Sequence, residues 1–366
     1  MKIGILTYHS VFNCGAILQS FALKKQLELL GHKVYYINYV HNIDWNIKQF
    51  IGRTPISFYH KYLRIYKILR YGYLNNFNDI LSNFTKRYYN IEELKKNPPD
   101  FDVYIAGSDQ IWNLSFLKNE NEIKIFFLDF GSKNIKRIAY APSMGDSDIS
   151  LDNKKLLNKL LLNFDSISVR ENESIDILKS INRNLRVNLI EDPTLLLNKE
   201  QYIKELNLKT EHNNNKLTTY LLHNINNQQK DFIDYFIKTN NLNHINIITP
   251  EYGVDKWEAK CYAKPKTWLT HFLNSKYIIT NSFHGVMFSL IFHKNFLALD
   301  YNILDKTNKR INSILASVNL ENRLVKPTDI QNYEKIIKTD INWELVDKEL
   351  KKMKEKNIVY LKTSLS

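Results

Sequence analysis

The chain alternates between short apolar runs and longer segments in which apolar residues recur at helical spacing. The first such unit has an apolar run at residues 3–6, helical periodicity over 16–30, and a run rich in β-formers at 33–38. Gly31 stands where a glycine commonly ends a helix. This order of strand, helix and strand predicts a parallel β-α-β unit.

The same alternation continues along the chain and restarts once. Residues 213–215 are three consecutive asparagines, so we place a domain boundary at 212–216. We predict an N-terminal α/β domain at 1–211, a C-terminal α/β domain at 212–330 and a helical segment at 331–366. The fold class is therefore α/β, with two Rossmann-like domains facing a cleft and a C-terminal helix packing back across them. The predicted strands are 3–6, 33–38, 102–106, 137–141, 166–169, 187–190, 218–222, 245–248, 277–280 and 296–299; the predicted helices are 16–30, 153–162, 173–179, 229–239, 266–274, 285–292 and 343–356.

Length and composition agree with two globular domains. The chain has 366 residues, against about 150 per typical domain. Hydrophobic residues at 44% and charged residues at 24% exclude disordered and fibrous classes. Cys14 and Cys261 are too few for a disulfide framework and fit a reducing compartment. Without a signal-peptide pattern or an apolar run long enough to span a membrane, we expect a cytoplasmic protein.

The net charge of +13 points to anionic partners, and part of it is concentrated in one segment. Residues 45–78 contain no acidic residue, and tyrosines lie between their basic ones. We interpret 45–95 as a basic helical insertion, either a solvated face or a peripheral contact with anionic lipid at the inner face of the membrane. No nucleic-acid-binding motif accompanies the charge, so no nucleic-acid partner is expected. The basic residues are Lys48, Arg53, Lys61, Arg64, Lys67 and Arg70.

Polar residues follow two predicted strands of the N-terminal half. Ligands of open α/β sheets bind at the carboxyl ends of the strands. The turn holding Asn13 and Gly15 opens the first helix, where backbone N–H groups favour an anion, although it also fits an ordinary turn. After the strand at 102–106, Asp109 can accept a proton, and Ser108 and Gln110 can hydrogen-bond a ligand. The alternative is a polar cap on the next helix.

Arginines offer candidate anion ligands. Arg170 directly follows the strand at 166–169, and its planar guanidinium matches a carboxylate or a phosphate. An ion pair with Glu171 is the competing interpretation. Arg310 is a further cation, which fits a surface charge when taken alone.

A histidine follows a strand of the second half. His284 lies between the strand at 277–280 and the next helix, and imidazole is a suitable general acid or base near neutral pH. Gly285 would let a ligand approach the backbone closely. A buried structural histidine is the alternative.

Six segments together resemble the polysaccharide pyruvyl transferase family. The resemblance runs over nearly the whole chain and implies a fold like that of the GT-B glycosyltransferases. It also implies transfer of a pyruvyl group from phosphoenolpyruvate to a sugar as a cyclic ketal, in bacterial surface polysaccharide (exopolysaccharide or capsule) assembly, with a sugar acceptor that can be lipid-linked. The segments are NCGAILQSFAL (13–23), FDVYIAGSDQIWN (101–113), AYAPSMG (139–145), ISVRE (167–171), DPTLLL (192–197) and ITNSFHGVMFSL (279–290).

With this chemistry in view, we expect His284 to act as acid or base. Arg170 would hold the carboxylate of phosphoenolpyruvate, and Arg310 or the turn at 13–16 its phosphate. Asp109, Ser108 and Gln110 would orient sugar hydroxyls or share in proton transfer. The scheme needs no metal and no cofactor beyond phosphoenolpyruvate as co-substrate.

The chain departs from the family pattern at one position near the histidine. Better-known members resemble Ser-Arg-x-His there, and Ser282 occupies the place of the arginine. A site for a multiply charged anion then needs another cation. Two alternatives stay open: a GT-B-like glycosyltransferase that uses a nucleotide sugar, and a non-catalytic protein that binds an anion or a membrane surface.

Overall fold

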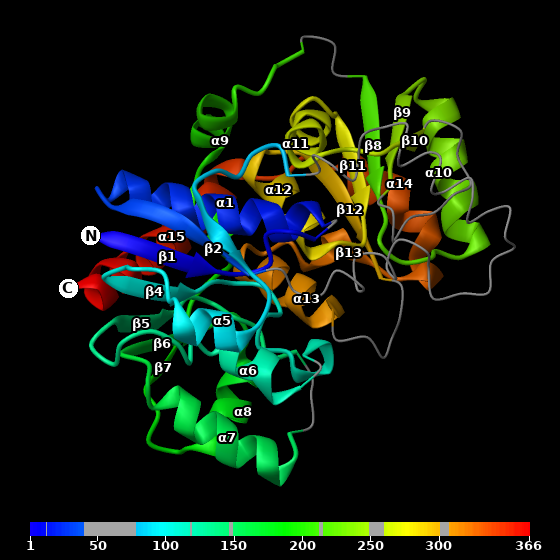
Figure 1. Ribbon diagram of the computed structural model, residues 1–366. Coiled ribbons are helices and arrows are strands. Elements are labelled where there is room, and N and C mark those ends of the chain that lie inside the picture. Colours follow the sequence, from blue (N-terminus) through cyan, green and yellow to red (C-terminus); the bar gives the residue numbers. More distant parts are fainter. Residues whose placement is uncertain are drawn as a thin grey trace, which may run out of the picture.

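The computed structural model describes residues 1–11, 13–39, 78–117, 119–145, 149–211, 215–248, 260–300 and 307–366. Two parallel β-sheets, each covered by helices, make up the molecule (Figure 1). The prediction of an α/β protein with two Rossmann-like halves and a long C-terminal helix is confirmed. The basic residues at 45–77 and the asparagine-rich segment at 212–214 lie outside the described residues.

The first sheet has seven parallel strands in the order β3-β2-β1-β4-β5-β6-β7. The chain moves outward from β1 in both directions, so the loops after β1 and β4 lie side by side at the point where the order reverses. The strands are β1 (Lys2–Leu6), β2 (Lys33–Tyr39), β3 (Phe84–Tyr88), β4 (Val103–Ala106), β5 (Lys136–Ala139), β6 (Ser166–Val169) and β7 (Val187–Leu189).

Among the described residues, the helices of this half are α1, α5, α6, α7, α8 and α9, with 3₁₀ turns η1 and η2. Gly31 follows α1 with a φ of +88°, as its sequence position predicts. The helices are α1 (Cys14–Leu29), α5 (Ile91–Lys96), α6 (Glu120–Phe126), α7 (Leu151–Leu161), α8 (Asn172–Ile181) and α9 (Lys199–Leu206), and the turns are η1 (Leu114–Phe116) and η2 (Pro193–Leu196).

One sequence-based expectation is corrected here. Residues 84–88 fall inside the segment 45–95 that we interpreted as a helical insertion, yet they form β3, which pairs with β2. The strand lies at the edge of the sheet and most of its side chains are exposed or only partly buried. An edge strand with polar side chains lacks the apolar run that marks an interior strand, which is why the sequence pattern missed it.

The second sheet repeats the topology of the first, with strands in the order β10-β9-β8-β11-β12-β13. All of its pairings are parallel. The strands are β8 (Lys216–Tyr220), β9 (Asn243–Ile247), β10 (Lys260–Cys261), β11 (Tyr277–Thr280), β12 (Asn295–Leu299) and β13 (Leu324–Val325). The helices are α10 (Asn227–Thr239), α11 (Pro265–Leu273), α12 (Phe283–Ile291), α13 (Thr307–Ser317) and α14 (Tyr333–Lys338), with 3₁₀ turns η3 (Glu321–Arg323) and η4 (Pro327–Asn332).

The two halves share a hydrophobic core. Cys14, Ile17 and Leu18 of α1 belong to the same buried cluster as Trp268 of α11 and Phe288 of α12. Burial of this apolar surface favours the docked arrangement of the two halves. As a result, the N-terminus of α1 lies directly against the second half.

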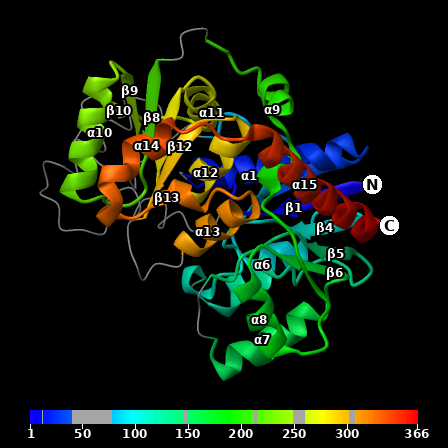
Figure 2. The same cartoon turned by 180° about the vertical axis from the view of Figure 1, so that it is seen from behind.

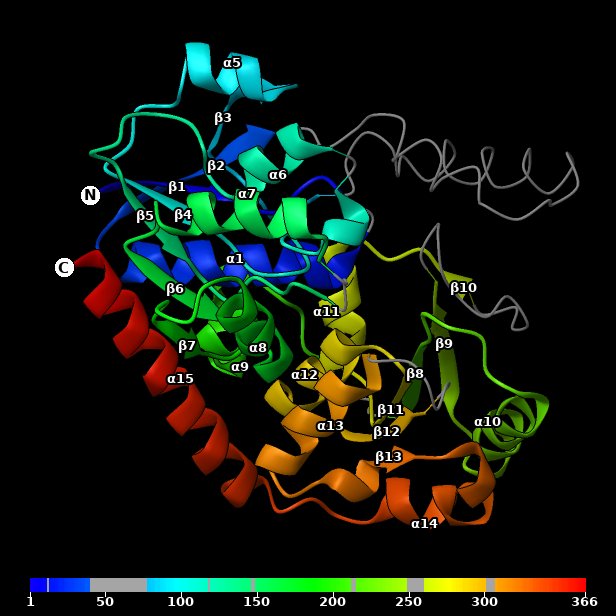
Figure 3. The same cartoon turned by 90° about the horizontal axis from the view of Figure 1, so that it is seen from below.

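The C-terminal helix α15 (Trp343–Leu365) connects both halves. Val346 near its start is buried in the shared cluster, whereas Leu361 and Leu365 near its end are buried under the first sheet. Figures 2 and 3 show the helix crossing from α14 to the first sheet, where the chain ends close to the N-terminus. The prediction that this segment packs back across the domains is confirmed, and the helix is longer than the predicted 343–356.

Candidate functional site

His284 lies in the first turn of α12, directly after β11. Ser282 caps this helix, because its Oγ accepts a hydrogen bond of 3.3 Å from the backbone N–H of Gly285. A Cβ on Gly285 would lie 2.3 Å from Oγ1 of Thr280, so the glycine lets α12 pack closely on β11. Packing alone accounts for this glycine, and its contact with a ligand stays a prediction.

The imidazole of His284 lies against the N-terminus of α1. A Cβ on Gly15 would come within 2.1 Å of Nδ1 of His284, so only glycine fits there. Asn13 caps α1, because its Oδ1 accepts hydrogen bonds from the backbone N–H groups of Gly15 and Ala16 at 2.9 and 3.3 Å. Two of the amides that we expected to hold an anion are therefore already bonded within the turn.

Asp192 lies between His284 and Arg170. It caps η2 and is fully buried, and its Oδ1 accepts hydrogen bonds from the N–H and the hydroxyl of Thr194 at 2.9 and 2.8 Å. Its Oδ2 accepts one of 2.7 Å from Nη1 of Arg170 and lies 3.6 Å from Nε2 of His284. Burial alone would raise the pKa of this carboxyl, but His284, Arg170 and Thr194 outweigh it and lower the pKa well below its usual range.

Arg170 follows β6 and is buried. Its Nε donates to Oε1 of Glu171 at 3.0 Å, so the ion pair that we considered as an alternative does form. Its Nη2 is also buried but has no hydrogen-bond partner. Burial lowers the pKa of Arg170, but the carboxylates of Glu171, Asp192 and Asp109 raise it above its ordinary value. A charged guanidinium with an unbonded, enclosed N–H is suited to an anionic ligand.

Arg310 on α13 contributes a second cation. Its guanidinium lies 5.5 Å from the ring centre of Phe283, and that of Arg170 lies 5.4 Å from the same ring. Burial lowers the pKa of Arg310, and the charge of Arg170 lowers it further. Within the described part of the chain, Arg310 has no hydrogen bond or ion pair. Arg170 and Arg310 therefore lie near each other, and two neighbouring guanidinium groups suit a multiply charged anion.

The loop after β4 brings Asp109 close to both arginines, since its charge affects the pKa of each. Asp109 has a φ of +73°, a left-handed conformation that is uncommon outside glycine. Its Oδ1 accepts a bond from the N–H of Gln110 at 2.8 Å. Ser108 is fully buried and donates to the carbonyl of Ala141 at 2.7 Å. Gln110 accepts a bond from Asn113 at 2.7 Å. These bonds hold the strained loop in place.

The structure therefore brings together five of the residues singled out in the sequence: Gly15, Asp109, Arg170, His284 and Arg310. Asn13, Ser108, Gln110 and Ser282 use their side chains to hold the surrounding turns. Asp192 was missed as a site residue, although it follows the last strand of the first half at the edge where Arg170 lies. That position could have identified it.

The described residues contain no group of three or more histidine, cysteine, aspartate or glutamate side chains placed to hold a metal ion. No helix among them is long and apolar enough to cross a membrane.

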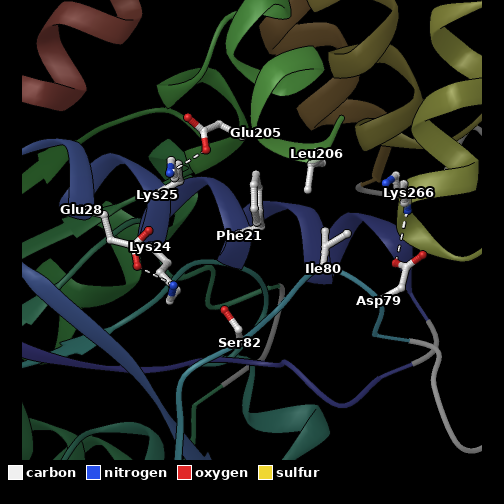
Figure 4. Close-up of a pocket in the computed structure, with 10 residues that line it drawn as sticks. All are labelled: Phe21, Lys24, Lys25, Glu28, Asp79, Ile80, Ser82, Glu205, Leu206 and Lys266. Carbon is white, nitrogen blue, oxygen red and sulfur yellow. Dashed lines mark hydrogen bonds and ion pairs between the residues drawn. The ribbon is translucent and has the colours of Figure 1, made fainter. Parts of the chain in front are cut away.

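A separate cavity of about 320 Å³ lies along α1 (Figure 4). Phe21, Ile80 and Leu206 line it together with charged side chains, but none of the candidate site residues do. Its lysines are largely neutralised. Lys25 pairs with Glu205 at 2.6 Å, and Lys24 pairs with Glu28 at 2.5 Å. The cavity is thus distinct from the cluster around His284.

Comparisons with known proteins were made on sequence and on fold. Residues 13–303 match the family model described as polysaccharide pyruvyl transferase. No curated protein gave a match. The solved structure of Arabidopsis thaliana UGT89C1 complexed with quercetin is similar in fold, with 12% identity, a TM-score of 0.48 and coverage of 98% of both chains. The glycosyltransferase SnogD from Streptomyces nogalater has 11% identity, a TM-score of 0.44 and coverage of 100% of this chain and 99% of that one. The UDP-GlcNAc 2-epimerase from Methanocaldococcus jannaschii has 11% identity, a TM-score of 0.47 and coverage of 96% of this chain and 92% of that one.

Proposed function

Since the chain belongs to the polysaccharide pyruvyl transferase family, we propose that it transfers a pyruvyl group from phosphoenolpyruvate to a sugar of a surface polysaccharide precursor, as a cyclic ketal. One observation carries the proposal. Arg170 has a buried, unbonded Nη2, and Arg310 lies against the same phenyl ring, close to His284. Phosphoenolpyruvate has a carboxylate and a phosphate, and each matches a guanidinium.

The two arginines divide the donor between them. Arg170 is fixed by Asp192 and Glu171, so its free Nη2 has a defined direction and suits the planar carboxylate. Arg310 has no such carboxylate partner in the described residues and suits the phosphate. Ser282 stands where the family pattern has an arginine, and Arg310 supplies the positive charge that this position lacks.

Ketal formation adds a proton and two sugar hydroxyl oxygens to phosphoenolpyruvate and releases its phosphate. A proton adds to the methylene carbon of phosphoenolpyruvate, which leaves a cation at the neighbouring carbon. A sugar hydroxyl attacks that carbon and gives up its proton. Phosphate then leaves, and a second hydroxyl attacks the same carbon, gives up its own proton and closes the ring. In this proposal His284 donates and accepts these protons. Asp109 orients the hydroxyls, and Ser108 and Gln110 keep its loop in position.

The acceptor is proposed to be a lipid-linked sugar that is modified in the cytoplasm. The basic residues at 45–78, all of which lie outside the described part of the chain, would hold the enzyme at the anionic inner face of the membrane. Reversing the charges of Lys61, Arg64 and Lys67 is then expected to weaken binding to anionic liposomes. Unchanged binding of that variant would exclude this contact.

A thermal-shift screen tests the donor class. Phosphoenolpyruvate at millimolar concentration is expected to raise the melting temperature, because a ligand that binds only the folded state stabilises it. A shift with nucleotide sugars and none with phosphoenolpyruvate would instead favour a glycosyltransferase. The variant His284→Ala is expected to abolish turnover and keep the fold. A protein that merely binds an anionic surface would have no turnover for this substitution to remove.

A further inference from the structure

We propose that Asp192 is the positioning residue of this site: it holds the proton of the His284 ring on Nε2 and fixes the Arg170 guanidinium, leaving Nδ1 of His284 to exchange protons with the substrates. The inference rests on the proposed function and assigns a working nitrogen to its acid–base group. The buried carboxylate of Asp192 then acts on one residue of each half, Arg170 in the first and His284 in the second.

The bonding of Asp192 sets the tautomer. An ionised carboxylate has only acceptor atoms, so each polar atom facing it has to be a donor. Oδ1 is occupied by the two bonds from Thr194, and Oδ2 faces Nη1 of Arg170 and Nε2 of His284. Nε2 is enclosed and has no hydrogen-bond partner, and Asp192 is the acceptor that it faces. The arrangement therefore favours a proton on Nε2.

The opposite edge of the imidazole explains the glycine in α1. Nδ1 faces Gly15, and a Cβ there would overlap it at 2.1 Å. Because this position has no side chain, the ring packs against the backbone of Gly15. Nδ1 has no hydrogen bond within the described residues and, unlike Nε2, is not fully enclosed. The distance of 3.6 Å from Nε2 to Asp192 is longer than a hydrogen bond, and such contacts commonly shorten when substrate binds.

Asp192 also links the anion-binding group to the acid–base group. It follows β7 of the first half, whereas His284 opens α12 of the second half. The other charged groups around the ring are Arg170 and Glu171 after β6, Asp109 after β4, and Arg310 on α13. Among the described residues, Asp192 is the one carboxylate that forms an ion pair with His284.

Long-range ¹H–¹⁵N spectra of the histidine rings test the assignment directly. The signal of His284 is identified by its loss in His284→Gln. In the unaltered protein it is expected to show the pattern of a ring protonated on Nε2. In Asp192→Asn that pattern should be lost, and kcat should fall about 100-fold or more, as when an aspartate that orients a catalytic histidine is neutralised.

Thr194→Val is the matched control. It removes one hydrogen bond to Asp192 and keeps the charge, so the Nε2 pattern and most of kcat should remain. A His284 ring protonated on Nδ1 in the unaltered protein would overturn the inference, even if Asp192→Asn does not fold. An unchanged ring signal in a folded Asp192→Asn, with activity equal to that of Thr194→Val, would also overturn it. Failure of phosphoenolpyruvate to bind would refute the proposed function but not the ring assignment, so the two can be told apart.

Discussion

Gly15 and His284 lie edge to edge where α1 meets α12. The absence of a Cβ on Gly15 is what allows the imidazole to occupy its place, since Nδ1 lies within 2.1 Å of where that atom would be. His284 cannot retreat easily, because its other edge faces the buried Asp192. The position of the acid–base group therefore depends on a residue with no side chain of its own.

Gly15→Ala is expected to displace the His284 ring. The rate of phosphate release from phosphoenolpyruvate should then fall about 100-fold, because misplacing a reacting group by about 1 Å lowers the rate by about that factor. The matched control is Gly31→Ala after the same helix. A Cβ there meets nothing within 4 Å, although its φ of +88° adds strain. Both variants should fold by circular dichroism. Equal activity of the two variants would contradict the contact described here.

Asp192 should also make stability depend on pH. Its pKa is lower in the folded protein than in the unfolded chain. The stability it contributes is therefore complete above the unfolded pKa of about 3.9 and is lost as the pH falls from there toward the folded pKa. In urea unfolding, the difference in unfolding free energy between the unaltered protein and Asp192→Asn should shrink as the pH falls below about 4. A difference that stays constant through this range would exclude the lowered pKa.

Part of the site follows from sequence and part does not. Asp109, Arg170 and His284 could be singled out because each follows a recognisable strand. Ser108 and Gln110 have the same chemistry, but their bonds go to Ala141 and Asn113, and residue type alone cannot distinguish a ligand contact from a loop contact. The role of Asp192 depends on its contacts with Arg170 and His284, which are distant from it in the chain and cannot be paired with it from sequence alone.

At the scale of elements, the interior strands of both sheets could be predicted because both faces are buried. Strands β1, β4 and β11 are almost entirely buried, which produces uninterrupted apolar runs. β3 lies at an edge and β10 and β13 have two residues each, so they carry no such run. Short helices such as α14 are stabilised by tertiary packing and are too short to show a periodic pattern in the sequence.

Helix α15 supports the segment that carries Asp192. Asn357 is fully buried, and its side chain accepts from the N–H and donates to the carbonyl of Glu191, both at 3.1 Å. Tyr360, one turn later, donates to the carbonyl of Ala139 at 2.9 Å. The C-terminal helix thus helps hold the main chain immediately before the site.

Asn357→Ala is expected to lower the free energy of unfolding by about 2 kcal/mol, because it leaves two backbone groups of Glu191 without partners. Urea unfolding measures this change. Lys351→Ala on the exposed face of the same helix should change it by less than about 0.5 kcal/mol. If both variants lost the same stability, α15 would not support this segment in the way described.

For the whole molecule, the site exists only because two halves share a core. Arg170, Asp109 and Asp192 come from the first half and His284 and Arg310 from the second, while the buried cluster around α1 sets their relative position. The net charge of +13 does not describe this site. Its two arginines lie among the carboxylates of Asp109, Glu171 and Asp192, so affinity for an anion depends on which N–H groups remain unbonded.

Calorimetric titration of phosphoenolpyruvate tests the central claim most directly. The unaltered protein should bind it, and Arg310→Met should weaken binding at least about 10-fold, because a charge-assisted pairing with the phosphate is lost. Lys309→Met removes the neighbouring charge, which pairs with Glu173 at 3.5 Å, and should bind as the unaltered protein does. Absence of binding to the unaltered protein, or equal affinities of the two variants, would contradict the account.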